Sequence, residues 1–214
     1  MQIALIISIV VFLLFLFMIG ASIRWRKAGT GEPRVLLSGG GTGGHVNPAL
    51  AIAEGIKTRE PNTRFLYLGV KNRAESVIVT KAGYTLQFVT SEGFPGFKLS
   101  VPLFRFLVKL GIGVIQSLAI LITFSPRWVI ATGGYVSAPV IAAALILKKL
   151  RIAHVRIFLH EQNSIPGQLN ALMGKWVDRV LLTFPQTLSF FPNNGVVVGY
   201  PIRHSIVAIT SDEA

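Results

Sequence analysis

The feature that most restricts the fold of this chain is a glycine-rich turn between an apolar run and a helix. Residues 39–50 read GGGTGGHVNPAL and follow the apolar run Val35-Leu36-Leu37 after one residue, Ser38. Glycines let backbone N–H groups close on an anion, and a helix N-terminus adds the positive end of its dipole. We expect Asn47 to cap the helix and Pro48 to lie in its first turn. The turn therefore predicts a phosphate or nucleotide site.

Two common nucleotide-binding motifs do not fit this turn. Gly39, Gly41 and Gly44 satisfy G-x-G-x-x-G, but a dinucleotide site also needs an acidic residue at the end of the second strand. That strand is predicted at 64–68, and no acid follows it before Glu75. No Gly-Lys-Ser/Thr follows the glycines, so a P-loop is excluded as well.

Apolar runs alternate with longer helical patterns along the rest of the chain. Strands are predicted near 34–38, 64–69, 85–90, 128–132, 156–160, 179–183 and 196–199. Helices are predicted near 48–59, 74–82, 102–123, 138–150 and 166–176. This alternation predicts an α/β fold, a Rossmann-like parallel sheet with helices on both faces. Ligands of such sheets bind beyond the carboxyl ends of the strands.

Two further polar turns follow predicted strands, and a fourth short motif comes after them. Residues 131–139 read ATGGYVSAP, residues 159–167 read LHEQNSIPG, and residues 198–203 read VGYPIR. Together with GGTGGH, and in this order, they closely resemble the MurG family of glycosyltransferases (glycosyltransferase family 28). The resemblance runs from about Arg34 to Arg203 and concerns the amino-terminal domain of that family.

The resemblance implies a fold and a reaction. The family's GT-B enzymes transfer N-acetylglucosamine from UDP-N-acetylglucosamine to undecaprenyl-diphosphoryl-muramoyl-pentapeptide, converting lipid I to lipid II in peptidoglycan biosynthesis. This chain then corresponds to the acceptor-side half. The implied partners are the donor UDP-N-acetylglucosamine and an undecaprenyl-diphosphate-linked acceptor in the membrane. No cofactor and no metal ion are implied, because glycine loops and helix dipoles can carry the phosphate charge.

Two residues are candidates for the base that glycosyl transfer requires. His45 stands beside the glycines, and an ordinary imidazole pKa near 6.5 suits a base at neutral pH; the resemblance supports it in this role. A histidine that only binds diphosphate or caps the turn remains the alternative. Glu161 is a second candidate base, and Gln162 is positioned to orient the sugar or the base. His160 is interpreted as structural, holding a backbone group at the strand end.

The resemblance also implies the substrate-binding residues. Those matching the family's contacts to the UDP-N-acetylglucosamine donor are Thr42, Gly43, Gly44, Asn163 and Arg203. Those matching the second glycine loop, expected to cradle the acceptor diphosphate, are Gly133, Gly134, Tyr135 and Ser137. Two positions depart from the family pattern: Tyr200 replaces an Asn, and Arg156 places a charge in a normally apolar strand.

The first residues of the chain predict a membrane anchor. Residues 3–23 carry no charge, and 21 residues at about 1.5 Å each reach roughly 30 Å, the hydrocarbon thickness of a bilayer. Arg24, Arg26 and Lys27 follow, so the domain should face the cytoplasm. A cleaved signal peptide is the competing interpretation, but it would have a basic start and a shorter apolar stretch. We therefore predict a single-pass transmembrane anchor with a short basic linker at 1–33, in a bacterial plasma membrane.

Charge is unevenly distributed over the chain. The net charge is +12, and residues 93–160 contain no Asp or Glu. Basic residues interleaved with Phe94, Phe97, Phe104 and Phe106 suit anionic lipid headgroups, although a solvated basic face is the alternative. No nucleic-acid recognition motif accompanies the charge, so nucleic acid is not an expected partner.

The apolar stretch 103–123 raises the possibility of a second membrane span. Arg105 and Lys109 interrupt it, and each cation near the centre of a span costs roughly 2.5–3.5 kcal/mol. We interpret it instead as a long helix packed on the sheet, one end of which dips to the bilayer.

The family's enzymes consist of two such domains, whereas this sequence holds one, at 34–214. With the carboxyl-terminal donor domain absent, the chain is expected to be a half-enzyme. It would need a donor domain from a separate polypeptide or from a continuation of its own chain. The alternative is a non-catalytic, membrane-anchored module that binds a polyprenyl-diphosphate lipid or recruits a glycosyltransferase subunit.

Overall fold

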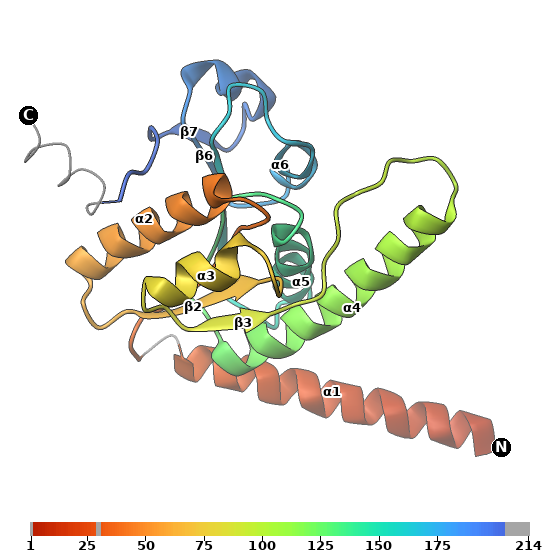
Figure 1. The fold of residues 1–214 in the computed structure, drawn as a ribbon. Coiled ribbons are helices and arrows are strands. Elements are labelled where there is room, and N and C mark those ends of the chain that lie inside the picture. Colours follow the sequence, from red (N-terminus) through yellow and green to blue (C-terminus); the bar gives the residue numbers. More distant parts are fainter. Residues whose placement is uncertain (1, 29–30, 204–214) are drawn as a thin grey trace, which may run out of the picture.

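Seven parallel strands form the centre of the structure, in the order β3-β2-β1-β4-β5-β6-β7 (Figure 1). The computed structural model describes residues 2–28 and 31–203; residues 29–30 of the predicted linker and 204–214 of the predicted domain lie outside this description. The strands are β1 (Arg34–Ser38), β2 (Arg64–Gly69), β3 (Leu86–Phe88), β4 (Trp128–Ala131), β5 (Arg156–Glu161), β6 (Arg179–Leu182) and β7 (Gly195–Val197). All seven predicted strands are confirmed, and their ends differ from prediction by two residues at most.

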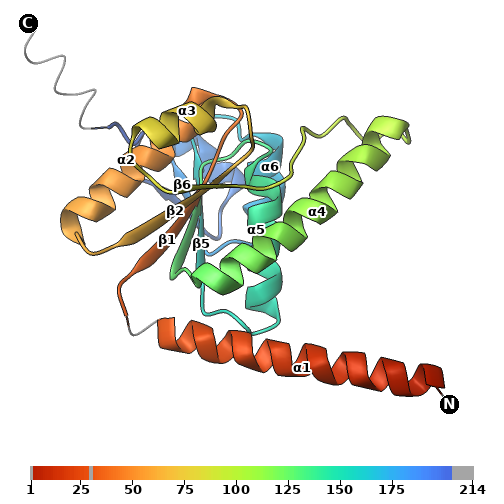
Figure 2. The same cartoon turned by 60° about the horizontal axis from the view of Figure 1, so that its bottom comes forward.

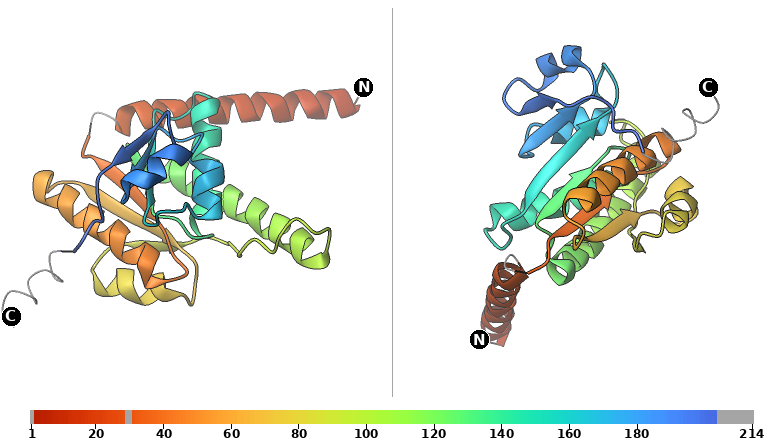
Figure 3. Two further views of the ribbon diagram at one scale, coloured as in Figure 1. Left: turned by 90° about the horizontal axis from the view of Figure 1, so that it is seen from above. Right: turned by 90° about the vertical axis from the view of Figure 1, so that its left-hand side faces the viewer.

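Helices cover both faces of this sheet, as predicted (Figures 2 and 3). They are α1 (Gln2–Ala28), α2 (Gly43–Arg59), α3 (Ala74–Lys81), α4 (Val101–Phe124), α5 (Ser137–Lys149) and α6 (Gln168–Met173), with a 3-10 helix η1 (Pro185–Phe190). One apolar core lies between α2, α3 and the sheet and includes the buried Leu50, Tyr67 and Val79. The other lies beneath α4 and α5, around Leu121 and Ile141.

The strand order places a topological switch point between β1 and β4. From β1 the chain builds β2 and β3 outward on one side, then returns so that β4 pairs with the other edge of β1. The two connections leave the sheet in opposite directions, which opens a crevice at the carboxyl ends of these strands. The first two glycine turns begin there, after Ser38 and after Ala131.

Helix α2 begins five residues earlier than predicted. Its first residue is Gly43, preceded by Thr42 in an extended conformation, so Asn47 and Pro48 lie inside the helix. The prediction that Asn47 caps the helix and Pro48 occupies its first turn is therefore wrong. The chain before Gly43 is fixed by tertiary bonds, since Tyr67 Oη donates to Gly39 O at 2.6 Å and Gly41 N donates to Glu75 Oε2 at 3.1 Å. The helix can therefore begin at Gly43, despite the weak helix propensity of glycine.

Helix α4 is attached to the domain by only its carboxyl-terminal half. Its buried residues are Gly113, Ser117 and Leu121, and this half packs against α5. The first half and the loop before it project from the domain (Figure 1). We call the exposed side chains there the apolar tip: Phe94, Phe97, Leu99, Val101 and Phe104.

Within the part of the chain that the structure describes, α4 is long and apolar enough to cross a membrane by length and composition. Its buried half is a core helix, however, because it packs on α5 and the sheet. A spanning α4 would draw the domain into the lipid. The interpretation as a helix packed at one end therefore fits the structure better than a second span.

The carboxyl-terminal end of α1 packs on the domain next to the end of α4. Ala21 and Trp25 are buried in the core. Arg24 Nη2 donates to Thr123 O at 3.0 Å, and Arg34 Nη1 donates to Phe124 O at 2.8 Å. Two cations thus satisfy the last carbonyls of α4, where the helix dipole is negative. The amino-terminal ends of α1 and α4 project from the same side of the domain (Figure 3, left).

Candidate active site at the switch point

The glycine turns after β1 and β4 lie in direct contact. A Cβ on Gly134 would lie 2.3 Å from Gly40 O, and one on Gly39 would lie 2.0 Å from Thr132 Oγ1. Gly134 also has a φ of +74°, a backbone conformation that glycine adopts without strain. Each turn therefore leaves no room for a side chain of the other, and together they form one rigid floor at the switch point.

A buried carboxylate holds the first turn in place. Glu75 has no exposed surface, and it lies in the first turn of α3, where the helix dipole favours negative charge. Its Oε2 accepts from Gly41 N at 3.1 Å, and its Oε1 accepts from Val70 N at 3.0 Å. A Cβ on Gly40 would lie 2.6 Å from this carboxyl group, so Gly40 is needed for the close approach.

His45 lies between the two turns. Its Nδ1 is 2.9 Å from Thr132 O, and Thr132 Oγ1 donates to the backbone oxygen of His45. A carbonyl oxygen only accepts, so in this bond the proton is on Nδ1, and in the neutral imidazole the lone pair is then on Nε2. The ring lies against the second turn, because a Cβ on Gly133 would be 3.3 Å from Nδ1 and Cε1. Among the described residues, none makes a hydrogen bond to Nε2.

The second turn is closed by its own side chains. Ser137 Oγ is buried and lies 2.9 Å from Gly133 O and 3.2 Å from Ser38 O. The Tyr135 ring stands beside the first turn, 3.2 Å from where a Cβ of Gly41 would be. Of the four residues predicted here, Gly134 and Tyr135 are half-buried, whereas Gly133 and Ser137 are buried. Ser137 therefore shapes the turn from within.

The third polar turn is built around Glu161. This side chain is buried, and its Oε1 accepts from the backbone N and the Nδ2 of Asn163, at 2.9 and 3.0 Å. Its Oε2 accepts from Gly167 N at 3.0 Å and from Asn170 Nδ2 at 2.9 Å. With each oxygen accepting two hydrogen bonds, the carboxylate organises the turn. The geometry thus favours His45 over Glu161 as the base.

The same turn presents the two residues that follow Glu161. Asn163 is exposed, with its amide nitrogen held by Glu161. Gln162 points the other way, and its Nε2 donates to Thr132 O at 2.6 Å. The three turns are therefore linked through the carbonyl of Thr132, which also contacts His45.

Arg203 is the predicted site residue that lies away from the glycine turns. Its Nε donates to Glu54 Oε1 at 2.8 Å. Glu54 lies on α2 eleven residues after Gly43, about 16 Å along the helix at 1.5 Å per residue. The exposed Thr42 and Gly44 and the half-buried Gly43, by contrast, lie at the mouth of the site.

His160 has the structural role predicted for it. It is buried, and its Nε2 lies 3.4 Å from Gly199 O, which ties the chain after β7 to the end of β5. Burial lowers the pKa of His160 below its ordinary value of 6.5 because desolvation disfavours the imidazolium.

Two residues of the site carried no recognised signal in the sequence: Glu75 and Asn170. Glu75 lies 34 positions from the glycine nitrogen that it accepts from, and Asn170 lies nine positions from Glu161. Only the fold brings them together. An acid just inside a predicted helix, after a strand that ends in glycine, is a signal that could have pointed to Glu75.

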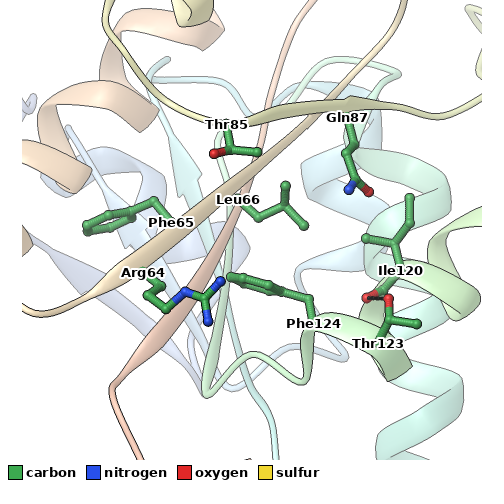
Figure 4. Close-up of a pocket in the computed structure, with 8 residues that line it drawn as sticks. All are labelled: Arg64, Phe65, Leu66, Thr85, Gln87, Ile120, Thr123 and Phe124. Carbon is green, nitrogen blue, oxygen red and sulfur yellow. Dashed lines mark hydrogen bonds between the residues drawn. The ribbon is translucent and has the colours of Figure 1, made fainter.

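Two other features bear on ligand binding. A cavity of about 450 Å³ lies near the amino-terminal end of β2, between β2, β3 and the carboxyl-terminal end of α4 (Figure 4). Its lining includes Arg64, Leu66, Gln87 and Phe124, and it is remote from the glycine turns. No group of three or more His, Asp or Glu side chains suited to a metal ion occurs among the described residues.

Comparison with known proteins agrees with this geometry. Residues 35–182 match the glycosyltransferase family 28 N-terminal domain. The UDP-N-acetylglucosamine–N-acetylmuramyl-(pentapeptide) pyrophosphoryl-undecaprenol N-acetylglucosamine transferase of Alkaliphilus oremlandii is 40% identical over 183 residues, which cover 85% of this chain and 48% of the relative. A Bacillus cereus enzyme of the same name is 43% identical over 165 residues, 77% of this chain and 43% of the relative.

The solved structures give the same result. The crystal structure of Acinetobacter baumannii MurG is similar with a TM-score of 0.65 and 25% identity, over 79% of this chain and 46% of that one. The chain thus spans about half the length of the curated relatives that it matches. By the extent of the match and the order of its motifs, the chain belongs to glycosyltransferase family 28, of which it carries the amino-terminal domain.

Proposed function

We propose that this chain is the acceptor-side half of a glycosyltransferase that moves N-acetylglucosamine from UDP-N-acetylglucosamine to an undecaprenyl-diphosphate-linked muramoyl-pentapeptide. The observation that carries the proposal is His45 at the switch point. Its Nδ1 is engaged by Thr132 O and its Nε2 is directed away from that bond, between two glycine turns. The names of the relatives supply the substrate class.

We propose a chemical role for His45 that fits this geometry. Nε2 takes the proton from the acceptor hydroxyl as its oxygen bonds to the anomeric carbon of the donor sugar. The bond from that carbon to the phosphate oxygen breaks, and UDP leaves with the electron pair. A positioned base contributes about 10²- to 10⁴-fold to such a step.

The start of α2 is suited to a diphosphate. The amides of Gly43 and Gly44 belong to the first turn of the helix, whose N–H groups have no intrahelical acceptor. The helix dipole adds positive potential there. Gly41 N is already bonded to Glu75, so the anion would be held by the residues after it.

Catalysis requires a donor-side domain in addition to the described residues. The matched relatives are about twice as long as the matched region. We propose that a continuation of this chain or a second polypeptide supplies the missing contacts to uridine. Thr42, Asn163 and Arg203 are the residues proposed to meet the donor from this side.

We further propose that the domain is held on the cytoplasmic face of the plasma membrane by α1. This helix has 27 residues, about 40 Å at 1.5 Å per residue, which exceeds the hydrocarbon thickness of roughly 30 Å. The apolar tip projects on the same side as the start of α1, and the exposed Lys98 and Arg105 lie in the same stretch of chain, Arg105 being paired with Glu92. Such a surface fits anionic headgroups.

The test is a transfer assay with a chimera. Residues 1–203 are joined to the carboxyl-terminal half of the Bacillus cereus relative, and transfer of radiolabelled N-acetylglucosamine to lipid I is measured in membranes. We expect transfer by the chimera and a loss of about 10²-fold or more in His45→Ala. The matched control is His154→Ala, because His154 is an exposed histidine outside the site.

A second function is favoured by the apolar tip, whose Phe97 is 92% and Leu99 95% exposed. A non-catalytic module that binds a polyprenyl-diphosphate lipid would need this tip and the glycine turns but no base. It predicts lipid I binding by the chain, no transfer by the chimera, and no effect of His45→Ala on binding.

A further inference from the structure

Gln162 contacts the same backbone oxygen as the proposed base. Its Nε2 donates to Thr132 O at 2.6 Å, and His45 Nδ1 lies 2.9 Å from that oxygen. A carbonyl oxygen has two lone pairs, so it can accept both bonds at once. Gln162 and His45 are therefore coupled through one carbonyl, although they come from different turns.

This carbonyl belongs to a peptide unit that could rotate. It joins Thr132 to Gly133, whose φ is +94°. Glycine adopts positive and negative φ with similar ease, so a peptide that precedes it can turn over. The turned peptide would present the N–H of Gly133 toward the imidazole in place of an acceptor.

The orientation of this peptide decides the tautomer of His45. Facing a carbonyl, Nδ1 holds the proton and Nε2 is the basic nitrogen. Facing an N–H, Nδ1 would have to accept, and the proton would be on Nε2. An imidazole in that form cannot take a proton from a hydroxyl through Nε2.

Gln162 stabilises the orientation seen in the structure. Its Nε2 donates to the carbonyl oxygen, and this bond is lost when the peptide turns over. Its own Oε1 is buried and has no hydrogen-bond partner among the described residues, so the side chain is held there by this donated bond. The residue before it, Glu161, is fixed by four hydrogen bonds at the end of β5, which gives Gln162 a rigid base.

We propose that Gln162 is a positioning residue: by donating to Thr132 O it holds the carbonyl that keeps the proton of His45 on Nδ1 and leaves Nε2 as the base. The catalytic role given to Gln162 rests on the proposed function of His45 as the base. The tautomer itself is a property of this chain alone and can be measured without any activity.

The test is NMR of the full chain in nanodiscs with ¹⁵N-labelled histidine, at about pH 8.5, well above the ordinary imidazole pKa. The His45→Ala spectrum identifies the His45 ring signals. We expect the wild type to carry its ring proton on Nδ1, and Gln162→Met, which keeps the length of the side chain without its donor, to show a population protonated on Nε2. Gln186→Met is the matched control, since Gln186 is exposed on η1.

The outcomes separate the two proposals. A wild-type His45 that is protonated on Nε2, or a tautomer that is unchanged by Gln162→Met, overturns the role of Gln162 whatever the activity of the chimera.

In the chimera, we expect Gln162→Met to lower kcat about 10- to 100-fold with little change in KM, as for groups that orient metal-bound histidines through their second nitrogen. A raised KM for UDP-N-acetylglucosamine with unchanged kcat would instead make Gln162 a donor-binding residue and overturn the inference. A wild-type chimera without transfer would refute the proposed function, and the NMR result would still decide the tautomer.

Discussion

The glycines at the switch point and the glycines near the apolar tip have opposite surroundings. A Cβ on Gly39, Gly40 or Gly134 would come within 2.0 to 2.6 Å of neighbouring atoms. A Cβ on Gly93 or Gly96 would meet nothing within 4 Å. The first group permits close contact with Thr132, with Glu75 and between the two turns, whereas the second group lies in an exposed loop with open space around it, where Gly96 has a φ of +102°. The site is therefore fixed before substrate arrives, and the tip is free to adapt to a soft surface.

The largest effect should come from filling one of the close contacts. Gly134→Ala places a Cβ 2.3 Å from Gly40 O at a φ of +74°, which should destabilise the fold by about 3–5 kcal/mol through overpacking and backbone strain. Urea unfolding of the full chain measures this. Gly93→Ala is the control and should leave the unfolding midpoint unchanged. Equal effects of the two substitutions would remove the contrast between the regions.

The two regions also differ in their carboxylates. Glu75→Ala leaves the N–H groups of Gly41 and Val70 without their acceptor in a buried site, so we expect a loss of about 2–4 kcal/mol. At the edge of the tip, Glu92 pairs with Arg105 and Lys109 near solvent. Its replacement by Gln should not change stability measurably. A larger loss for Glu92→Gln than for Glu75→Ala would contradict this order.

A smaller effect concerns pH and His160. Burial lowers the pKa of His160 in the folded state, so folding stability is fully present above the unfolded pKa near 6.5 and decreases as the pH falls through the lower folded pKa. The urea midpoint of the wild type should therefore fall between about pH 7 and pH 5. His160→Asn should flatten this part of the curve. A wild-type midpoint that rises on acidification would show that the imidazolium is stabilised in the fold.

The smallest effect on folding is expected for spin labels that test the apolar tip. Because the sequence contains no cysteine, a single introduced cysteine can be labelled selectively. A nitroxide on Phe97→Cys should enter the lipid of anionic nanodiscs without changing the unfolding midpoint, because Phe97 is 92% exposed. The same label on Glu60→Cys, at the far end of α2, should stay in water. Equal depths for both labels would argue against a membrane-facing tip.

The sequence was sufficient for those features that depend on local pattern. Buried parallel strands are short apolar runs, and glycine or polar turns mark their ends, so all seven strands and the sites of the three turns could be predicted. The start of α2 could not, because Asn47-Pro48 has the local pattern of a helix start. The tertiary bonds to Tyr67 and Glu75 override that pattern and let the helix begin at Gly43.

The site shows the same division. The motif that contains His45 was visible, but its partner Thr132 O is a backbone atom 87 positions away, which no side-chain pattern encodes. Glu161 was predicted as a possible base because of its residue type. Its four hydrogen-bond donors come from a turn whose shape only the fold defines. Residue types thus indicated the candidate positions, and the three-dimensional contacts show that each oxygen of Glu161 accepts two hydrogen bonds, whereas Nε2 of His45 has no hydrogen-bond partner among the described residues.

The pairing of β1 with β4 also sets the order in which the protein can be made. β1 ends at Ser38 and β4 begins at Trp128, so about 90 residues are synthesised before one edge of β1 finds its partner. Distant pairings of this kind form late, because the entropy of closing the loop opposes them. The crevice at the switch point can assemble only after β4 has been synthesised. A nascent chain interrupted before Trp128 would thus hold β1, β2 and β3 but no crevice, and it would expose the open edge of β1 to aggregation.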